Sequence, residues 1–474
     1  MNLCHCNLLV AAWISSAGNA AVNLTTTLIP TSVTVNNSAV NYEFGGVGKL
    51  SGATRLVKQG AGKLTIKTAN DFTGGTTIEG GTLDLGGGTD SGSLGTGPIT
   101  NDGTLVLNRI SNFAVGNAIS GTGTIIKKSA TNDVSLSATN SGFDGPILVE
   151  EGRLSVTNVV ALGVGSKTTT VNSGAAVYFL TGSTTSTIFN PFSLSGTGAF
   201  GETTGALRIG ANNLSFGGSI TLAADASIGV DSGQTGTITG VIGGPGAFTK
   251  SGPGTLALAG IEANTFPGLT NVAAGTLQLN KPDGVAALMG DTEVNGGTLT
   301  WLQPNQIADT ASITLNTGGI NTGNRADTLA NLTINTATPI STFSGLTVTG
   351  TLTVTAGIHD AVNSSGIMSA EKVVLSNANI RMGVNSGPST LQIGAGGLSM
   401  TDATIQYGSA GNSAQIGLVT LGGNLTASGN NFFDINTGNP ISQLDLGDAS
   451  RLFDIIAGIT TVESVIQSAT ATAG

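Results

Sequence analysis

Two histidines are the first side chains to consider for acid–base chemistry. The sequence holds only His5 and His359. A Ser-His-Asp hydrolase would need His359 as its base, since His5 lies in a segment predicted to be removed. The adjacent Asp360 cannot orient His359 from a neighbouring strand position. We therefore interpret His359 as a loop or outward-facing residue without a catalytic role.

Grouped carboxylates could instead supply the acid and base of a polysaccharide lyase or hydrolase. The candidates are Asp71, Glu79 and Asp84 in one repeat copy, with Glu150 and Glu151 in the next. A third copy carries uncharged residues, mostly Ala, Thr and Gln, at these positions. The prediction is that the chain has no catalytic residue and is not an enzyme; a polysaccharide-active enzyme remains the alternative.

Aromatic residues and glycine motifs offer little more. Sugar-binding clefts commonly use aromatic platforms, and past the N-terminal segment only Trp301 and three tyrosines are available for one: Tyr42, Tyr178 and Tyr407. Trp301 occupies the position of inward leucines in equivalent strands, so we expect it to pack inside. Residues 196–201 match a dinucleotide fingerprint without a following helix, and residues 46–49 and 60–63 lack the Ser or Thr of a phosphate loop. The glycine run 86–90 does not recur as a calcium motif. No cofactor or metal is predicted.

Composition favours strands and turns over helices. Glycine occurs 73 times, proline 12 times, and charged residues make up 9% of the chain. Thr, Val, Ile, Gly and Asn dominate, whereas helix formers are scarce. The net charge of -10 would repel a phosphate backbone, which excludes nucleic acid as a partner.

The N-terminal segment resembles a secretory signal. Cys4 and Cys6 precede an apolar run over residues 8–14 and small residues ending at Ala20. We predict a signal peptide over residues 1–20, which would leave a mature chain without cysteine and hence without disulfides.

One module recurs in three clear copies, over residues 58–105, 128–176 and 250–300. Each copy contains two glycines 22 residues apart: Gly81 and Gly103, Gly152 and Gly174, Gly275 and Gly297. Short strands with apolar residues at every second position begin beside them, as in Thr82–Leu85 and Thr276–Leu279. Degenerate rungs continue over 301–463, and residues 464–474 read as a flexible tail.

Strands that recur about every 20 residues without an intervening helical period predict a parallel β-helix. One rung buries too few apolar side chains to offset the entropy of ordering it, so rungs must stack. We predict an all-β fold, a single elongated right-handed β-solenoid of about 20 rungs over residues 21–463.

The module resembles the passenger-associated repeat of bacterial autotransporters. The residues that carry this resemblance are 58–66, 70–78 and 80–85, and again 250–279. The resemblance implies a secreted or cell-surface protein of a Gram-negative bacterium and an outer-membrane β-barrel translocator as partner. Residues after 400 lack the strand pattern and aromatic girdles of such a barrel.

We predict a non-catalytic passenger that acts in adhesion, surface display or extracellular matrix contact. Its partners would be glycans, a host or neighbouring-cell surface, or further copies of itself. A self-assembling extracellular filament subunit is the other alternative, because an uncovered end rung invites strand pairing.

Overall fold

The chain is all-β in this computed structural model. The structure describes residues 11–14, 20–182, 185–202, 204–338, 344–407, 417–435, 443–447, 449–462 and 465–467. Strands and turns fill these ranges, and no helix among them could span a membrane. Parallel strands stack as a β-solenoid of about 18 turns, which confirms the predicted fold class and rung number. The chain divides into two compact units, residues 1–246 and 247–474.

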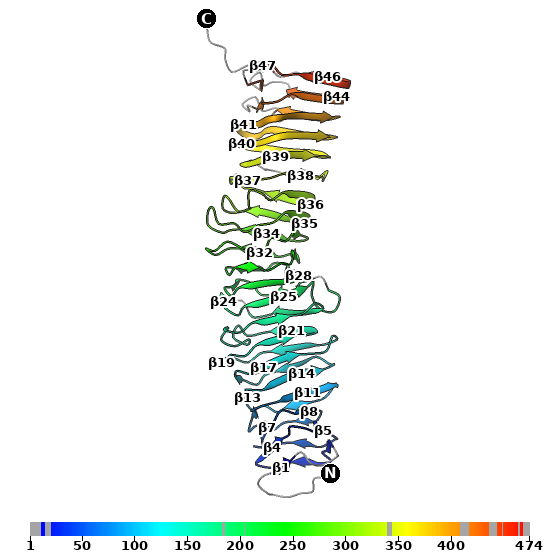
Figure 1. The fold of residues 1–474 in the computed structure, drawn as a ribbon, viewed down its shortest axis with the longest axis vertical. Coiled ribbons are helices and arrows are strands. Elements are labelled where there is room, and N and C mark those ends of the chain that lie inside the picture. Colours follow the sequence, from blue (N-terminus) through cyan, green and yellow to red (C-terminus); the bar gives the residue numbers. More distant parts are fainter. Residues whose placement is uncertain are drawn as a thin grey trace. The chain divides into compact units, whose positions relative to one another are not determined.

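By their pairings, the strands of the first unit form three main parallel stacks and three smaller ones. Figure 1 shows strands of this unit lying one above another. One stack contains β1 (Ala11–Ile14), β4 (Ser32–Asn36), β7 (Arg55–Gln59), β10 (Thr76–Ile78), β13 (Ile99–Asn101), β16 (Ile119–Gly121) and β19 (Gly142–Phe143). A second contains β2 (Ala21–Asn23), β5 (Tyr42–Gly45), β8 (Lys63–Ile66), β11 (Thr82–Thr89), β14 (Thr104–Arg109), β17 (Thr124–Lys127), β20 (Ile147–Val149), β22 (Thr169–Val171), β25 (Phe192–Gly196), β28 (Ile220–Val230) and β30 (Ile242–Gly243). The third contains β15 (Phe113–Val115), β18 (Asp133–Leu136), β21 (Gly152–Val156), β23 (Ala175–Phe179), β26 (Leu207–Ile209) and the second half of β28. The smaller stacks are β24 (Ser186–Ile188), β27 (Leu214–Phe216) and β29 (Thr235–Ile238); β3 (Thr27–Leu28) and β6 (Lys49–Leu50); and β9 (Ala69–Asn70) and β12 (Ser93–Leu94).

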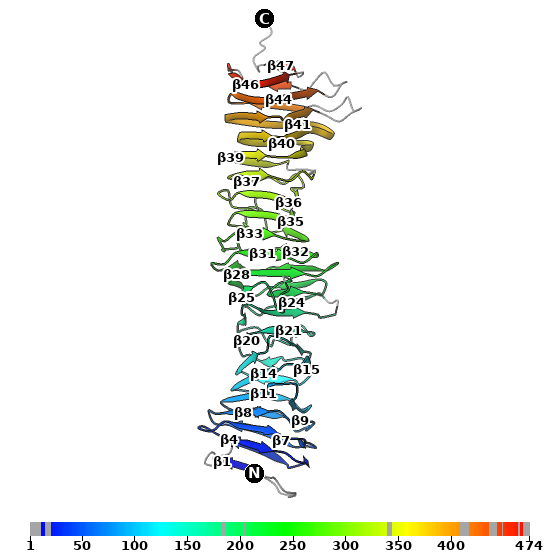
Figure 2. The ribbon, with the colours of Figure 1, turned by 90° about the vertical axis from the view of Figure 1, so that its right-hand side faces the viewer.

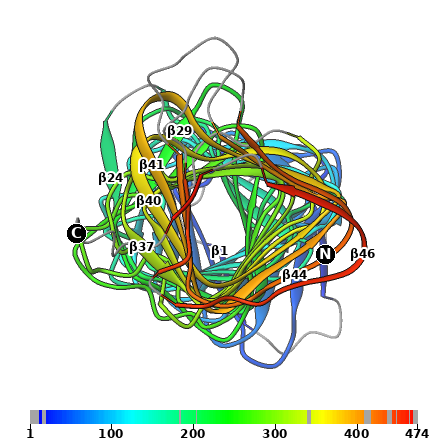
Figure 3. The same ribbon diagram turned by 90° about the horizontal axis from the view of Figure 1, so that it is seen from above.

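The second unit also consists of parallel strands, some of them longer than any strand of the first unit (Figure 2). Its strands are β31 (Phe248–Ser251), β32 (Thr255–Leu258), β33 (Thr270–Val272), β34 (Thr276–Leu279), β35 (Thr292–Trp301), β36 (Ile313–Asn321), β37 (Asp327–Leu329), β38 (Leu332–Ile334), β39 (Leu346–Val354), β40 (Gly357–Ser376), β41 (Ala378–Thr401), β42 (Thr404–Tyr407), β43 (Gly417–Leu421), β44 (Leu425–Ile435), β45 (Gln443–Asp445), β46 (Phe453–Val462) and β47 (Val465–Gln467). β40 and β41 pair in parallel and follow the same course around the turn (Figure 3).

The strand register confirms the interval of the module. Thr82 pairs with Thr104, and Thr276 pairs with Thr298, which places one turn at 22 residues in both units. In the second module Gly152 pairs with Ala175 and not with Gly174. That turn is one residue longer than the glycine spacing indicates.

The core follows the predicted alternation, but some outward-facing residues of the first unit are buried as well. Leu83 and Leu85 of β11 point inward and are buried, as expected for a strand with one apolar face. Asp84 between them is also buried, although it lies on the outer face. The backbone N–H of Gly87 donates to its carboxylate at 3.2 Å. Residues Gly86 to Gly88 all have positive φ, and this loop folds back over the outer face of the strand.

Two predictions concern segments that the structure describes only in part. Within the predicted signal peptide, residues 11–14 form β1, which pairs with β4, and the other residues before Ala20 lie outside the described ranges. Within the predicted tail, only residues 465–467 are described, as β47 paired with β45. Cleavage near Ala20 and flexibility of residues 464–474 stay predictions.

Candidate functional site

The acids of the first module do not form a catalytic pair. Asp71 follows β9, Glu79 follows β10 and Asp84 lies in β11, and these three strands belong to three different sheets. Glu79 accepts a hydrogen bond from the Gln59 amide at 2.8 Å. Because these stacks form different sides of a turn, the three carboxylates cannot reach the same atom of a substrate.

A lysine also accompanies several of these carboxylates. Asp71 accepts a hydrogen bond from Lys49, which lowers the pKa of Asp71 below its usual value and keeps it ionised. Lys63 Nζ lies 3.7 Å from Asp84 Oδ2, and Lys128 Nζ lies 3.1 Å from Glu150 Oε2. Asp71, held in its anionic form, is therefore a poor general acid.

The side chain of Glu151 is exposed, and this residue makes its contact through its backbone. Its carbonyl oxygen accepts a hydrogen bond from Lys127 Nζ at 2.9 Å. Within the part of the chain that the structure describes, no three His, Cys, Asp or Glu side chains gather as metal ligands.

His359 differs from its predicted environment. It lies in β40 with its side chain buried, so the interpretation as a loop or outward-facing residue is wrong. Its Nε2 lies 2.6 Å from the Ala356 carbonyl oxygen, and burial lowers the pKa of the ring. Asp360 takes the opposite face, as strand alternation requires, and binds Arg381 at 2.6 Å. The two residues therefore cannot act together.

Trp301 packs inside the solenoid, which confirms the prediction, and it also has a polar role. Its indole Nε1 donates to Asp327 Oδ2 at 2.6 Å. Asp327 Oδ2 accepts two further bonds, from the backbone N–H groups of Gln306 at 2.9 Å and Ile307 at 3.2 Å, and Oδ1 accepts one from Thr328 N–H at 2.9 Å. Burial raises the pKa of Asp327, while these donors act against that shift. Sequence reasoning missed this buried carboxylate.

Three buried lysines mark the clear modules. Lys58, Lys127 and Lys250 each donate three hydrogen bonds from Nζ to backbone carbonyl oxygens of two adjacent turns. The acceptors are Gln59, Gly60 and Gly80 at 2.7–3.2 Å, Lys128, Ser129 and Glu151 at 2.8–2.9 Å, and Ser251, Gly252 and Ala274 at 2.8–3.0 Å. We call these the Lys–carbonyl turns. Burial lowers the pKa of each lysine to about 8, so most of each population stays charged at pH 7.

Among the described residues, charged and aromatic side chains gather on the third stack of the first unit. Arg153 (β21), Tyr178 (β23) and Arg208 (β26) come from three successive turns. The guanidinium carbons of Arg208 and Arg153 lie 4.2 Å and 5.4 Å from the Tyr178 ring centroid. We call these three residues, with Asp133, Glu202 and Asp231, the Arg–Tyr cluster. Tyr178 is the one tyrosine of the three that is not buried in the core.

Carboxylates neutralise both arginines of the Arg–Tyr cluster. Arg153 Nη2 lies 3.1 Å from Asp133 Oδ2, and Arg208 Nε lies 2.9 Å from Asp231 Oδ1. Glu202 Oε2 lies 3.2 Å from Arg208 and 3.8 Å from Arg153, which links the two.

Tyr178 is held as a hydrogen-bond donor within the cluster. Its hydroxyl donates to Asp231 Oδ2 at 2.6 Å, and burial together with this bond raises the pKa of Tyr178 to about 12. A Cβ on Gly210 would lie 2.5 Å from the Tyr178 ring, so the close packing requires glycine there. A phenol with this pKa does not serve as a base at neutral pH.

The dinucleotide-like motif at residues 196–201 lies in the loop that covers this cluster. Phe200 adopts a φ of 58° and is 41% exposed, and its ring lies 5.3 Å from the Arg153 guanidinium carbon. The loop also carries Glu202. The glycines of this motif therefore form a loop and no nucleotide site. The sequence indicated only Tyr178 of the cluster, because Arg153 and Arg208 lie 25 and 30 residues from Tyr178, which is longer than one regular turn.

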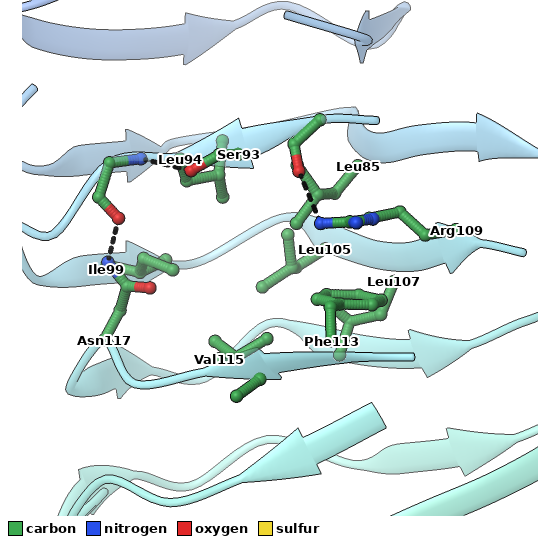
Figure 4. A pocket seen from close by; sticks show the side chains of 13 residues that line it. Leu85, Ser93, Leu94, Ile99, Leu105, Leu107, Arg109, Phe113, Val115 and Asn117 are labelled. Atoms are coloured by element: carbon green, nitrogen blue, oxygen red, sulfur yellow. Dashed lines mark hydrogen bonds between the residues drawn. The ribbon is translucent and has the colours of Figure 1, made fainter. Parts of the chain in front are cut away.

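A small cavity lies inside the first unit, among β11, β14 and β15 (Figure 4). Its volume is about 70 Å³, and its lining includes Leu85, Leu105 and Phe113. Arg109 borders it, stacked 4.8 Å over the Phe113 ring and bonded to Ser111 Oγ at 3.1 Å. It holds room for a few waters, and the residues that line it include no acid or histidine that could activate the Ser93 hydroxyl, so it is a gap in the packing.

Comparison with protein families supports the resemblance seen in the sequence. The model for the passenger-associated-transport-repeat matches residues 56–85 and 248–279. Neither the curated proteins nor the solved structures yielded a match to the chain. Both matched stretches include a Lys–carbonyl turn, at Lys58 and Lys250. With this repeat and its parallel β-solenoid, the chain is similar to autotransporter passenger proteins, whose repeat family implies an extracellular or cell-surface location.

Proposed function

We propose that the chain is a non-catalytic passenger displayed on the surface of a Gram-negative bacterium, where it acts in adhesion, surface display or extracellular matrix contact. An outer-membrane β-barrel translocator would be its export partner. Its other partners would be glycans, a host or neighbouring-cell surface, or further copies of the chain.

One observation carries this proposal: the Arg–Tyr cluster, where charge and aromatic rings concentrate, is neutralised internally. Arg153 and Arg208 each bind a carboxylate, and Tyr178 donates to Asp231. The acids Asp71 and Glu150 are likewise held by lysines. Among the described residues, a surface of this kind offers many weak polar contacts on stacked turns, and none of the acids named here is an activated group.

Display on cells that lack their own adhesins tests the proposal. We expect cells exporting the full chain to attach to extracellular matrix proteins or to other cells, and purified protein to release no sugar ends from a broad glycan panel. Glycan cleavage that is lost in Asp71→Ala or Glu150→Ala would instead support a polysaccharide-active enzyme. Absence of attachment together with a cytoplasmic location would refute the proposal.

Self-assembly is a second candidate function, favoured by strand β46. Among the described residues β46 pairs with β44 alone. Ile455 pairs with the fully buried Ala427, yet it is 40% exposed, and Ile456 and Ile459 are 67% and 66% exposed. A second copy stacked on this strand would cover these isoleucine side chains. Light scattering that stays at the monomer value across concentrations would exclude this function.

A further inference from the structure

A continuous row of polar side chains runs along the outer face of the second unit. Asn295 Nδ2 donates to Asn271 Oδ1 at 2.9 Å, Asn316 to Asn295 at 2.8 Å, and Asn335 to Asn316 at 3.0 Å. Thr355 Oγ1 donates to Asn335 Oδ1 at 3.1 Å. We call these five residues the Asn–Thr ladder. They contribute one side chain from each of five successive turns.

A second row of hydroxyls accompanies the Asn–Thr ladder. Thr314 pairs with Thr333, and Thr333 pairs with Thr353, in strands β36, β38 and β39. Each threonine lies two residues before its ladder residue, so both side chains leave the same face of the strand. Three successive turns therefore present a hydroxyl beside an amide or a second hydroxyl.

The ladder is held rigidly and retains hydrogen-bonding capacity. Between the two rows the inward residues Leu315, Ile334 and Val354 are fully buried, which fixes each strand. Asn295 donates both amide hydrogens, to Asn271 and Glu293. Asn316 and Asn335 each use one amide hydrogen and one oxygen lone pair toward their neighbours along the row. An asparagine side chain has two donors and two lone pairs, so one of each remains on these two residues for a ligand. Adjacent strands of a sheet lie about 4.8 Å apart, so this capacity repeats at that interval.

Charge restricts which ligand would fit. One charged residue lies in register with the second row: Glu293 pairs with Thr314, precedes Asn295 by two positions and accepts from it at 3.1 Å. Neither row contains a basic residue to bind phosphate, sulfate or carboxylate groups. The backbone groups of these strands are paired with neighbouring turns, so an added peptide strand finds no free edge on this face. A neutral polymer with regularly repeated hydroxyl groups is the complementary chemistry.

We propose that the Asn–Thr ladder binds a neutral, linear polysaccharide that lies along the stacked turns of the second unit. This inference rests on the proposed adhesive function and names its ligand class. Sugar hydroxyls would accept from the free amide hydrogens and donate to the free oxygens, while threonine hydroxyls exchange bonds with the same or the next sugar. Each contact is weak, and the affinity arises from several turns acting on one chain.

Binding to soluble glycans of graded length tests this inference. The probes are dextran, mannan and soluble β-glucan, with heparin as the charged comparison. We expect at least one neutral glycan to bind, with an affinity that increases with chain length, and heparin to bind less. The double variant Asn316→Ala/Asn335→Ala removes two adjacent amides and should weaken binding about tenfold or more, at about one factor of three to ten per lost hydrogen bond.

The chain offers a matched control on another stack. Thr77 and Thr100 pair with one another on the outer face of β10 and β13 in the first unit. Thr77→Ala/Thr100→Ala removes two paired polar side chains from a different stack and should leave glycan binding unchanged. Melting curves of both double variants should match the parent, since all four side chains lie outside the core.

Three results would overturn the inference: no binding to any neutral glycan, equal binding by the ladder variant, or equal loss in both double variants. Attachment of displaying cells is measured in parallel. If attachment persists while neutral glycans do not bind, the ladder inference fails and the adhesive function stands. If attachment is absent as well, the proposed function fails with it.

Discussion

The two matched repeats and the region after residue 300 bury charge in opposite ways. In the Lys–carbonyl turns an ammonium such as Lys250 fills a space bounded by three carbonyl oxygens. In the later region the Asp327 carboxylate collects an indole N–H and three backbone N–H groups. Neither kind of site depends on an ion pair.

The difference shows that the backbone groups facing a buried side chain determine whether that side chain is a cation or an anion. Where a turn directs its carbonyl oxygens inward, a cation satisfies them; where it directs N–H groups inward, an anion does. Burying an ion in an apolar interior is costly unless it is fully hydrogen-bonded, and each of these ions is. The loss of one such group should therefore expose several unsatisfied backbone groups at once.

Asp327→Ala should produce the largest effect in this comparison. It leaves four N–H donors without their acceptor, at about 1–3 kcal/mol for each buried group that finds no new partner. We expect a decrease of at least about 4 kcal/mol in the free energy of unfolding, measured by urea denaturation. Asp309→Ala removes an exposed carboxylate of the same unit and should change the midpoint little. Equal midpoints for both variants would show that Asp327 does not organise this turn.

Lys127→Met should produce an intermediate effect. Methionine fills a similar volume but leaves the carbonyls of Lys128, Ser129 and Glu151 without a donor, while it also removes a buried charge. Because these contributions oppose each other, we expect the free energy of unfolding to decrease by about 2 kcal/mol, measured by urea denaturation.

The adjacent Lys128 provides the matched control for that variant. Its side chain is 44% exposed and pairs with Glu150 on the surface. Lys128→Met should cost less than about 1 kcal/mol, as for other surface ion pairs. A larger loss for Lys128→Met than for Lys127→Met would reverse the assignment of the buried lysine.

The Lys–carbonyl turns also predict how stability changes with pH. Burial lowers the pKa of Lys58, Lys127 and Lys250 to about 8, whereas lysine in an unfolded chain titrates near about 10.4. Between these values the unfolded chain binds more protons than the folded chain. The free energy of unfolding should therefore rise as pH increases from about 8 to about 10.4 and should not rise further above that.

Denaturation at several pH values checks this slope. The slope should be smaller in Lys127→Met and smaller again in Lys127→Met/Lys250→Met, because each variant removes one titrating group. A stability that falls across this range in the parent and is unaffected by these variants would contradict the assignment.

Much of the fold follows from the sequence because its signal is local and repeated. The alternation in Thr82–Leu85 and the 22-residue spacing from Gly81 to Gly103 give the strand, its inward face and its register. The same alternation places Lys250 inward after Phe248, so the buried lysines could have been predicted from the pattern. A lone lysine is usually a surface residue, and that expectation concealed them.

The Arg–Tyr cluster and Asp327 could not be found in this way. Tyr178 meets Arg208 across a turn lengthened by the 197–205 loop, which removes the regular spacing. Asp327 reaches N–H groups 20 and 21 residues earlier and an indole 26 residues earlier, in a region where the module is degenerate. Contacts of this kind depend on how each turn is shaped, and the sequence contains no repeated signal for that shape.

Asp71→Asn gives the smallest effect and sets the baseline for the comparison. Asp71 carries the same charge as Asp327, but its side chain is half exposed and it binds the exposed Lys49. Water replaces that contact, and surface pairs of this kind contribute little to stability. We expect no measurable change in the denaturation midpoint at neutral pH, and none when salt is added to the parent. If Asp71→Asn cost as much as Asp327→Ala, burial and backbone polarity would not be what separates these two carboxylates, and the contrast between the two regions would fail.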